Sequence, residues 1–225
     1  MKSFNIDGWQ CDYAGFPDSD KIVYLIYPAL VPLSDKLIEK LSSLYKISVA
    51  VIYVAADKWN NALTPWPEPG ESKGFPPFAG EAENFLKIIT EKIIPSIEQN
   101  GDLKEGYQRS LIGVSLSGLF TLWQWMKCDV FKTIGSLSGS FWYNGFLTWF
   151  DKQEVPKKDG KAFFLLGKEE PLAKIKAYQS VGQATQAIVE RLKENGIDAT
   201  FEWVPGNHFS QPVHRLETAF EALFG

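Results

Sequence analysis

Cysteine is almost absent from this chain of 225 residues. Cys11 and Cys128 are the only two, and neither lies in a Cys-x-x-Cys pair or a Cys/His cluster. A disulfide framework and a structural zinc site are therefore excluded, because each needs more cysteine or histidine ligands. A reducing compartment, the cytoplasm, is the simplest expectation for such a chain.

Long apolar runs and blocks of basic residues are also missing. The best apolar run, residues 22–33, has 12 residues and two prolines, whereas a membrane-spanning helix needs about 20. Residues 1–20 hold no continuous apolar core of the secretory type. The charge balance of 23 Lys and Arg against 27 Asp and Glu gives −4 with no basic cluster. Neither nucleic acid nor a membrane is therefore an expected partner.

Aromatic residues, by contrast, are plentiful. The 16 Phe, 8 Tyr and 8 Trp make up 14% of the chain, and they either fill a core or wall a pocket for an apolar ligand. Residues 57–80 hold four of them and five of the 13 prolines, without periodicity. Because loops this long are uncommon and often functional, we expect this one to lie near the active site.

Short apolar runs alternate with helical patterns along the rest of the chain. This alternation predicts one α/β domain over residues 1–225, with a mostly parallel sheet flanked by helices. Apolar stripes predict helices within residues 37–44, 85–93, 181–192 and 216–223, and residues 119–126 predict a buried helix. The expected strands are residues 22–27, 48–55, 110–114, 133–137, 162–166 and 200–204, with an edge hairpin within 3–13.

A serine follows one of these strands at the start of the buried helix. From Gly113 to Gly118 the sequence is Gly-Val-Ser-Leu-Ser-Gly, a small-x-Ser-x-small turn of the kind that exposes a nucleophilic serine. A second Ser-Leu-Ser-Gly string makes Ser138 an alternative. Only Ser115 leaves room for a further strand and helix before the expected acid, as an α/β-hydrolase requires, so Ser115 is the predicted nucleophile.

A serine hydroxyl needs a base and an orienting acid. Of the two histidines, His208 follows the last predicted strand, whereas His214 lies at the start of the last helix. His208 is therefore the predicted base. The acid should follow the strand at residues 162–166, where Glu169 and Glu170 are both candidates.

These motifs resemble the esterase branch of the α/β-hydrolases that includes esterase D, the enterochelin esterases and the antigen 85 acyltransferases. The likeness covers most of the chain and rests on the elbow at 113–118, Ser-Gly-Ser-Phe-Trp at 138–142, Gly-x-x-Glu at 167–170 and Asn207-His208. It implies a three-layer αβα sandwich without a large cap domain. It also implies that the acid, three residues beyond the strand-ending glycine, is Glu170.

The resemblance further implies an oxyanion hole of two backbone N–H groups. One belongs to Leu116, and the other to the loop after residues 22–27. Pro28 there has no N–H, so Ala29 is the expected second donor, with Leu30 next. We expect no metal and no cofactor.

The sequence thus predicts a carboxylesterase-type serine hydrolase acting on a small-molecule ester through an acyl-enzyme. An acyltransferase with the same triad, a siderophore-ester hydrolase and a non-catalytic binding module remain alternatives. We expect Trp59 and Trp66 to fold back over the site, although the same aromatic loop could instead form a homodimer interface. The expected substrate-binding residues are Trp59, Trp66, Trp142, Tyr143 and Phe209.

Overall fold

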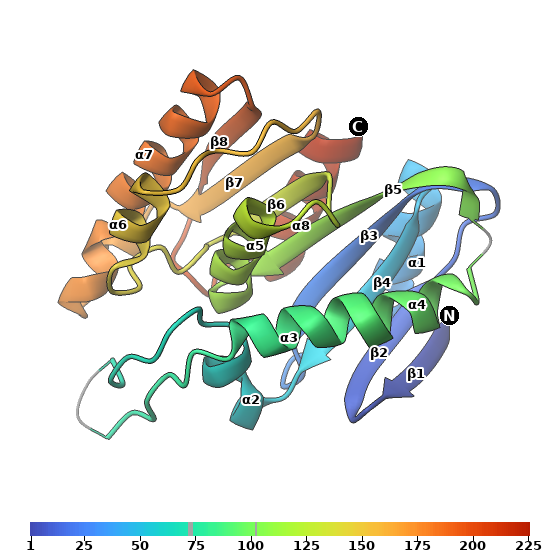
Figure 1. The fold of residues 1–225 in the computed structure, drawn as a ribbon, viewed down its shortest axis with the longest axis horizontal. Coiled ribbons are helices and arrows are strands. Elements are labelled where there is room, and N and C mark those ends of the chain that lie inside the picture. The colour runs from blue at the N-terminus through green and yellow to red at the C-terminus, as the bar shows by residue number, and fades with distance from the viewer. Residues whose placement is uncertain (72–73, 102) are drawn as a thin grey trace. The chain divides into compact units, whose positions relative to one another are not determined.

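The structure is a computed structural model that describes residues 1–71, 74–101 and 103–225. Its strands follow the order β1-β2-β4-β3-β5-β6-β7-β8 in an eight-stranded sheet (Figure 1). The prediction of an α/β fold with a mostly parallel sheet is confirmed, and the described part of the chain carries no large cap domain. Its contacts group into two compact units, Met1–Ile112 and Gly113–Gly225. A single domain over residues 1–225 stays a prediction.

The first unit begins with the predicted edge hairpin. Asp7 and Gly8 both have positive φ, 50° and 80°, as the two-residue turn favoured by Asp-Gly requires. The hairpin joins the sheet where β2 pairs with β4 antiparallel, and β3 pairs with β4 parallel. Every residue of β4 is buried, as expected for a strand covered on both faces. The strands are β1 (Lys2–Ile6), β2 (Trp9–Ala14), β3 (Ser19–Pro28), β4 (Ser48–Val54) and β5 (Leu103–Val114).

The helices of this unit differ from the expected stripes in two details. In α1 the buried apolar side chains are Ile38 and Leu41, whereas Leu44 is exposed. The helix does not end at Pro95. The helix passes through a π-helical stretch, Ile89–Ile93, in which the Ile94 N–H donates to the Ile89 carbonyl, and then continues into α4. The helices are α1 (Asp35–Tyr45), α2 (Ala56–Ala62), α3 (Ala82–Ile88) and α4 (Ile94–Glu98).

The second unit carries three parallel strands whose carboxyl ends meet at one edge. β6 pairs with β7, and β7 with β8, in parallel register. Helix α5 is buried over most of its length, as predicted, and α8 packs on β6 and β7 from behind in the view of Figure 1. The short helix α6 was not predicted. The elements are α5 (Leu116–Lys127), β6 (Thr133–Leu137), α6 (Phe146–Asp151), β7 (Lys161–Gly167), α7 (Val181–Glu194), β8 (Asp198–Val204) and α8 (Pro212–Phe224).

Candidate active site

Ser115 lies at the turn between β5 and α5, in a backbone conformation that side chains rarely adopt. Its φ is 60° and its ψ is −123°, outside the regions open to most L-residues. Its N–H donates to the Leu137 carbonyl at 2.9 Å, and its own carbonyl accepts from the Ser140 N–H at 3.1 Å. Hydrogen bonds from the β6 side therefore hold the strained turn in place.

The residues on either side of the turn must be small, as the sequence predicts. A Cβ on Gly113 would lie 2.1 Å from the Ser117 carbonyl oxygen, well inside contact distance. Ser117 replaces the more usual glycine and contributes bonds of its own. Its hydroxyl accepts from the Val114 N–H at 2.7 Å and donates to the Val114 carbonyl at 2.8 Å. A serine here thus ties the strand end to the first turn of the helix.

The three predicted side chains come together in the second unit. His208 Nε2 lies 3.0 Å from Ser115 Oγ, and His208 Nδ1 lies 2.8 Å from Glu170 Oε2. A carboxylate can only accept, so Nδ1 carries the proton and Nε2 is left to accept from the serine hydroxyl. The geometry is that of a nucleophile, a base and an orienting acid.

Glu170 is 5% exposed, whereas the neighbouring Glu169 is exposed. The second oxygen of Glu170, Oε1, accepts from the Gly167 N–H at 2.7 Å, from Ser138 Oγ at 2.7 Å and from Arg215 Nη1 at 2.8 Å. Three donors therefore fix one oxygen and leave the other for His208. Ser138, the alternative nucleophile, is 3% exposed and supports the acid instead.

The sequence matches the family described as "Putative esterase" over residues 34–212, about four fifths of the chain. The chain belongs to this esterase family. It is 33% identical over 135 residues to the protein YbbA of Bacillus subtilis (strain 168), in an alignment that covers 59% of this chain. The chain spans about half the length of that relative, 54%.

Solved structures of low sequence identity share the fold of this esterase family member. An IroE-like serine hydrolase from Shewanella oneidensis has a TM-score of 0.77 and 19% identity, with 96% of this chain and 75% of that chain covered. The enterobactin and salmochelin hydrolase IroE has a TM-score of 0.71 and 20% identity, covering 100% and 93%. The siderophore hydrolase EstB from Aspergillus nidulans has a TM-score of 0.72 and 16% identity, covering 99% and 93%.

The two expected oxyanion donors of the esterase differ in their surroundings. Leu116 is the first residue of α5, and its N–H has no hydrogen-bond partner among the described residues, as is usual in the first turn of a helix. The Ala29 N–H, by contrast, donates to the Val54 carbonyl at 2.9 Å. Because of that bond, the Ala29 N–H, which was the expected second donor, is already hydrogen-bonded. The next residue, Leu30, has an N–H without a partner in the described part of the chain and is the better candidate.

The expected substrate-binding residues of the second unit have unequal access to solvent. Phe209 is 87% exposed, and its ring lies 5.1 Å from the His208 ring, edge to face. Trp142 is half-buried, with its ring 4.5 Å from that of Tyr178. Tyr143 is only 2% exposed and offers a ligand almost no surface. Phe209 and Trp142 are therefore the stronger candidates.

The aromatic segment 57–80 is partly helical, because α2 covers its first residues. An isolated antiparallel β-bridge then pairs Glu68 with Phe78. Residues 72–73 lie outside the described residues. Trp59 and Trp66 are half-buried within the first unit. Their predicted role over the site, like the alternative of a dimer interface, stays a prediction.

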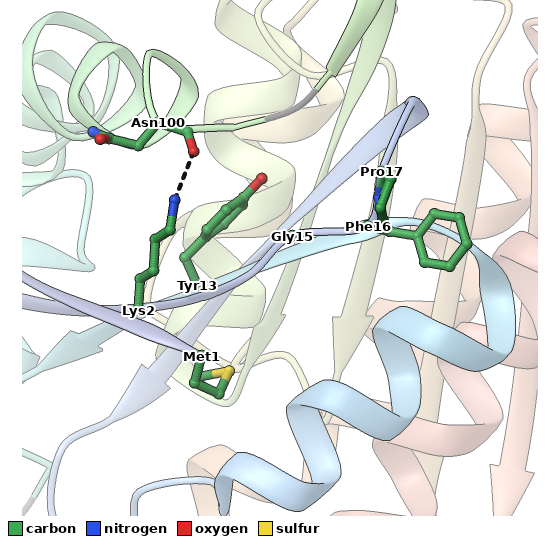
Figure 2. A pocket seen from close by; sticks show the side chains of 7 residues that line it. All are labelled: Met1, Lys2, Tyr13, Gly15, Phe16, Pro17 and Asn100. Atoms are coloured by element: carbon green, nitrogen blue, oxygen red, sulfur yellow. Dashed lines mark hydrogen bonds between the residues drawn. The ribbon is translucent and has the colours of Figure 1, made fainter.

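A shallow pocket of about 300 Å³ opens beside the N-terminal hairpin (Figure 2). None of the predicted site residues lines it. Its one lysine, Lys2, points to the Asn100 carbonyl and donates to it at 3.1 Å. No carboxylate, histidine or cysteine is present to act on a ligand there. The lining residues are Met1, Lys2, Tyr13, Gly15, Phe16, Pro17 and Asn100.

Residues 1–71, 74–101 and 103–225 show neither a candidate metal centre nor a membrane span. In these ranges no three His, Cys, Asp or Glu side chains are grouped so that they could hold a metal ion. No helix in the same ranges is long and apolar enough to cross a bilayer.

The environment of Glu170 has a measurable consequence for stability. Burial raises the pKa of this carboxyl, but hydrogen bonds and charge from His208, with donors from Gly167 and Ser138, outweigh burial and lower the pKa from 4.5 to about 2. A carboxyl with a lowered pKa contributes stability that is present above its unfolded pKa and lost as the pH falls through the folded one. The contribution is about 3 kcal/mol at neutral pH.

We therefore expect the free energy of unfolding of the wild type to fall between pH 4.5 and pH 2. Glu170→Gln has no charge to lose, so its deficit relative to the wild type should shrink over the same range. Urea unfolding of both proteins at pH 6, 4.5 and 3 measures this. A deficit that stays constant down to pH 3 contradicts the prediction.

Proposed function

We propose that the protein is a serine hydrolase that cleaves small-molecule carboxylic esters. The observation that supports this most is the chain of two hydrogen bonds, 3.0 Å from Ser115 to His208 and 2.8 Å from His208 to Glu170. Family membership agrees with it. The two free cysteines, Cys11 and Cys128, also agree with a reducing compartment such as the cytoplasm.

In the first half-reaction, His208 Nε2 takes the proton of Ser115 while Oγ attacks the ester carbonyl carbon. The resulting oxyanion is stabilised by the Leu116 N–H. Nε2 then gives the proton to the leaving alcohol, and an acyl-enzyme on Ser115 remains. Glu170 keeps Nδ1 protonated throughout and stabilises the imidazolium.

In the second half-reaction, His208 takes a proton from water, which attacks the acyl carbon. Collapse of the second tetrahedral intermediate releases the acid and returns the proton to Ser115. The acyl carbonyl oxygen becomes the oxyanion in both half-reactions and is stabilised in the same way in each. The exposed ring of Phe209, next to His208, is proposed to contact the substrate.

The test is an activity screen with p-nitrophenyl esters of increasing acyl length, together with a fluorophosphonate probe. We expect hydrolysis and stoichiometric labelling of the wild type. An acyltransferase would label equally but would form a new ester when an acceptor alcohol is added, so the products distinguish the two. Absence of both hydrolysis and labelling contradicts the proposed function and favours a binding module.

A siderophore ester is a second candidate substrate. Two of the solved structures with this fold are named as hydrolases of enterobactin and salmochelin and of siderophores. In this chain three exposed lysines follow β7, the strand that precedes the acid, and cations suit an anionic catecholate; they are Lys168, Lys174 and Lys176. Hydrolysis of enterobactin at a kcat/KM above that for p-nitrophenyl butyrate would support this substrate, and the reverse order would favour simple esters.

A further inference from the structure

A buried arginine lies where a helix would not be expected to place one. Arg215 is in the first turn of α8 and is 2% exposed. The N-terminus of a helix carries partial positive charge and disfavours cations, and a buried charge is costly unless it is paired. Its Nε has no hydrogen-bond partner among the described residues. Helix formation alone therefore does not account for this residue.

The guanidinium contacts two groups that hold the candidate base His208: the acid Glu170 and the backbone of Asn207. Its Nη1 donates to Glu170 Oε1 at 2.8 Å and also to Ser138 Oγ. Its Nη2 donates to the carbonyl of Asn207 at 2.6 Å. Asn207 immediately precedes His208, so one planar group joins the acid to the loop that carries the base.

The backbone around Arg215 is shaped to admit this group. A Cβ on Gly167 would lie 2.6 Å from Arg215 Nη2 and 2.3 Å from the Gly206 carbonyl oxygen. Only glycine at the end of β7 therefore lets the arginine and the histidine loop fit together. Within the loop that carries His208, the side-chain oxygen of Asn207 accepts a hydrogen bond from the Phe209 N–H at 3.0 Å.

We propose that Arg215 is a positioning residue for the triad, which fixes Glu170 toward His208 and holds the His208 loop through the Asn207 carbonyl. This inference rests on the proposed hydrolase function. In the described residues, the charged groups against Glu170 are His208 from the loop after β8 and Arg215 from α8. The cation offsets part of the carboxylate charge that His208 faces.

The test compares Arg215→Met and Arg215→Lys with the wild type on a p-nitrophenyl ester. Arg215→Met removes the charge and the hydrogen bonds to Glu170 and Asn207, but it keeps an unbranched side chain. Arg215→Lys keeps the charge but has no fork to span Glu170 and Asn207. Arg191→Met is the matched control, because Arg191 also donates to backbone carbonyls, of Phe150 and Gln153, and pairs with a carboxylate, that of Asp151.

For Arg215→Met we expect kcat to fall about 100-fold, because loss of the guanidinium contacts misplaces the base. KM should be unchanged, because the buried side chain does not touch substrate. The midpoint of the kcat/KM profile should rise by about one pH unit, because a cation has been removed from beside the acid. For Arg215→Lys we expect a fall of about tenfold with the midpoint unmoved. The control should stay within about twofold of the wild type in kcat, since it has no contact with the triad.

Other results overturn the proposal. A merely structural arginine would lower the melting temperature and leave the pH midpoint of the folded Arg215→Met variant unchanged. If Arg215→Met does not fold, Arg215→Lys decides, because full kcat in that variant shows that the bridging fork is not needed. A wild type that neither hydrolyses esters nor reacts with the fluorophosphonate probe instead overturns the proposed function, and this inference with it.

Discussion

Ser115→Ala is expected to abolish ester hydrolysis while the protein stays folded. The hydroxyl lies 3.0 Å from His208 Nε2, where it can give its proton to the base as it attacks the ester. Because triad members act as a unit, kcat should fall by about 10⁴-fold or more. The fold should survive, because the turn is held by the backbone of Ser115 through Leu137 and Ser140. Steady-state rates on a p-nitrophenyl ester, circular dichroism and fluorophosphonate labelling measure the three expectations.

Two further serines serve as comparisons. Ser180→Ala changes an exposed serine whose hydroxyl caps a local carbonyl, that of Ala177, and should leave the rate unchanged. Ser138→Ala removes one donor to Glu170 and should reduce the rate without preventing labelling. If Ser115→Ala is still labelled and Ser138→Ala is not, the nucleophile has been assigned to the wrong strand.

The nucleophile turn could be predicted because its requirements are local. A sharp passage from strand to helix admits only small residues at its flanks, and Gly113 and Ser117 meet this requirement in the sequence itself. The same holds for the edge hairpin expected within residues 3–13, whose turn in the structure is Asp7-Gly8, and for the last helix, which begins at Pro212. Each of these depends on backbone sterics within a few residues.

The second oxyanion donor and the exposure of the candidate substrate-binding side chains could not be predicted in the same way. Whether the Ala29 N–H is free depends on the register of β3 against β4, which brings the Val54 carbonyl to it. Whether Tyr143 or Trp142 faces solvent depends on how the segment after β6 packs. Both are consequences of tertiary structure, and both altered the expected roles.

The choice of Glu170 over Glu169 came from the resemblance, which places the acid three residues beyond the strand-ending glycine, and the residues themselves left both carboxylates open. In the structure β7 ends at Gly167, and Glu170 begins a short 3₁₀ helix, Glu170–Leu172. The turn, with the Gly167 N–H at 2.7 Å from Glu170 Oε1, selects the inward carboxylate. The role of Arg215 was not predicted, because an arginine at a helix start follows no established motif, although its unfavourable position against the helix dipole was a usable signal.

The acid provides the second large expected effect, and the chain offers an adjacent control. Glu170→Gln keeps the size of the side chain but removes the anion that holds Nδ1 protonated, and a triad that loses this anion falls by about 10⁴-fold in kcat. Glu169→Gln makes the same change at an exposed position whose side chain takes no part in the triad, and should leave kcat within about twofold. Both variants are assayed on the same ester.

Stability must be measured alongside these rates. Glu170→Gln leaves the Arg215 charge buried without its partner, and breaking a buried ion pair costs about 3–5 kcal/mol. The assay is therefore run well below the melting temperature of the variant, with circular dichroism showing that it is folded. Equal small losses in Glu170→Gln and Glu169→Gln would mean that Ser115 and His208 work as a dyad. The reverse order would move the acid to Glu169.

A loss confined to Glu170→Gln in folded protein would identify Glu170 as the acid. Unfolding alone would lower the amount of active enzyme and leave the kcat of the folded fraction unchanged.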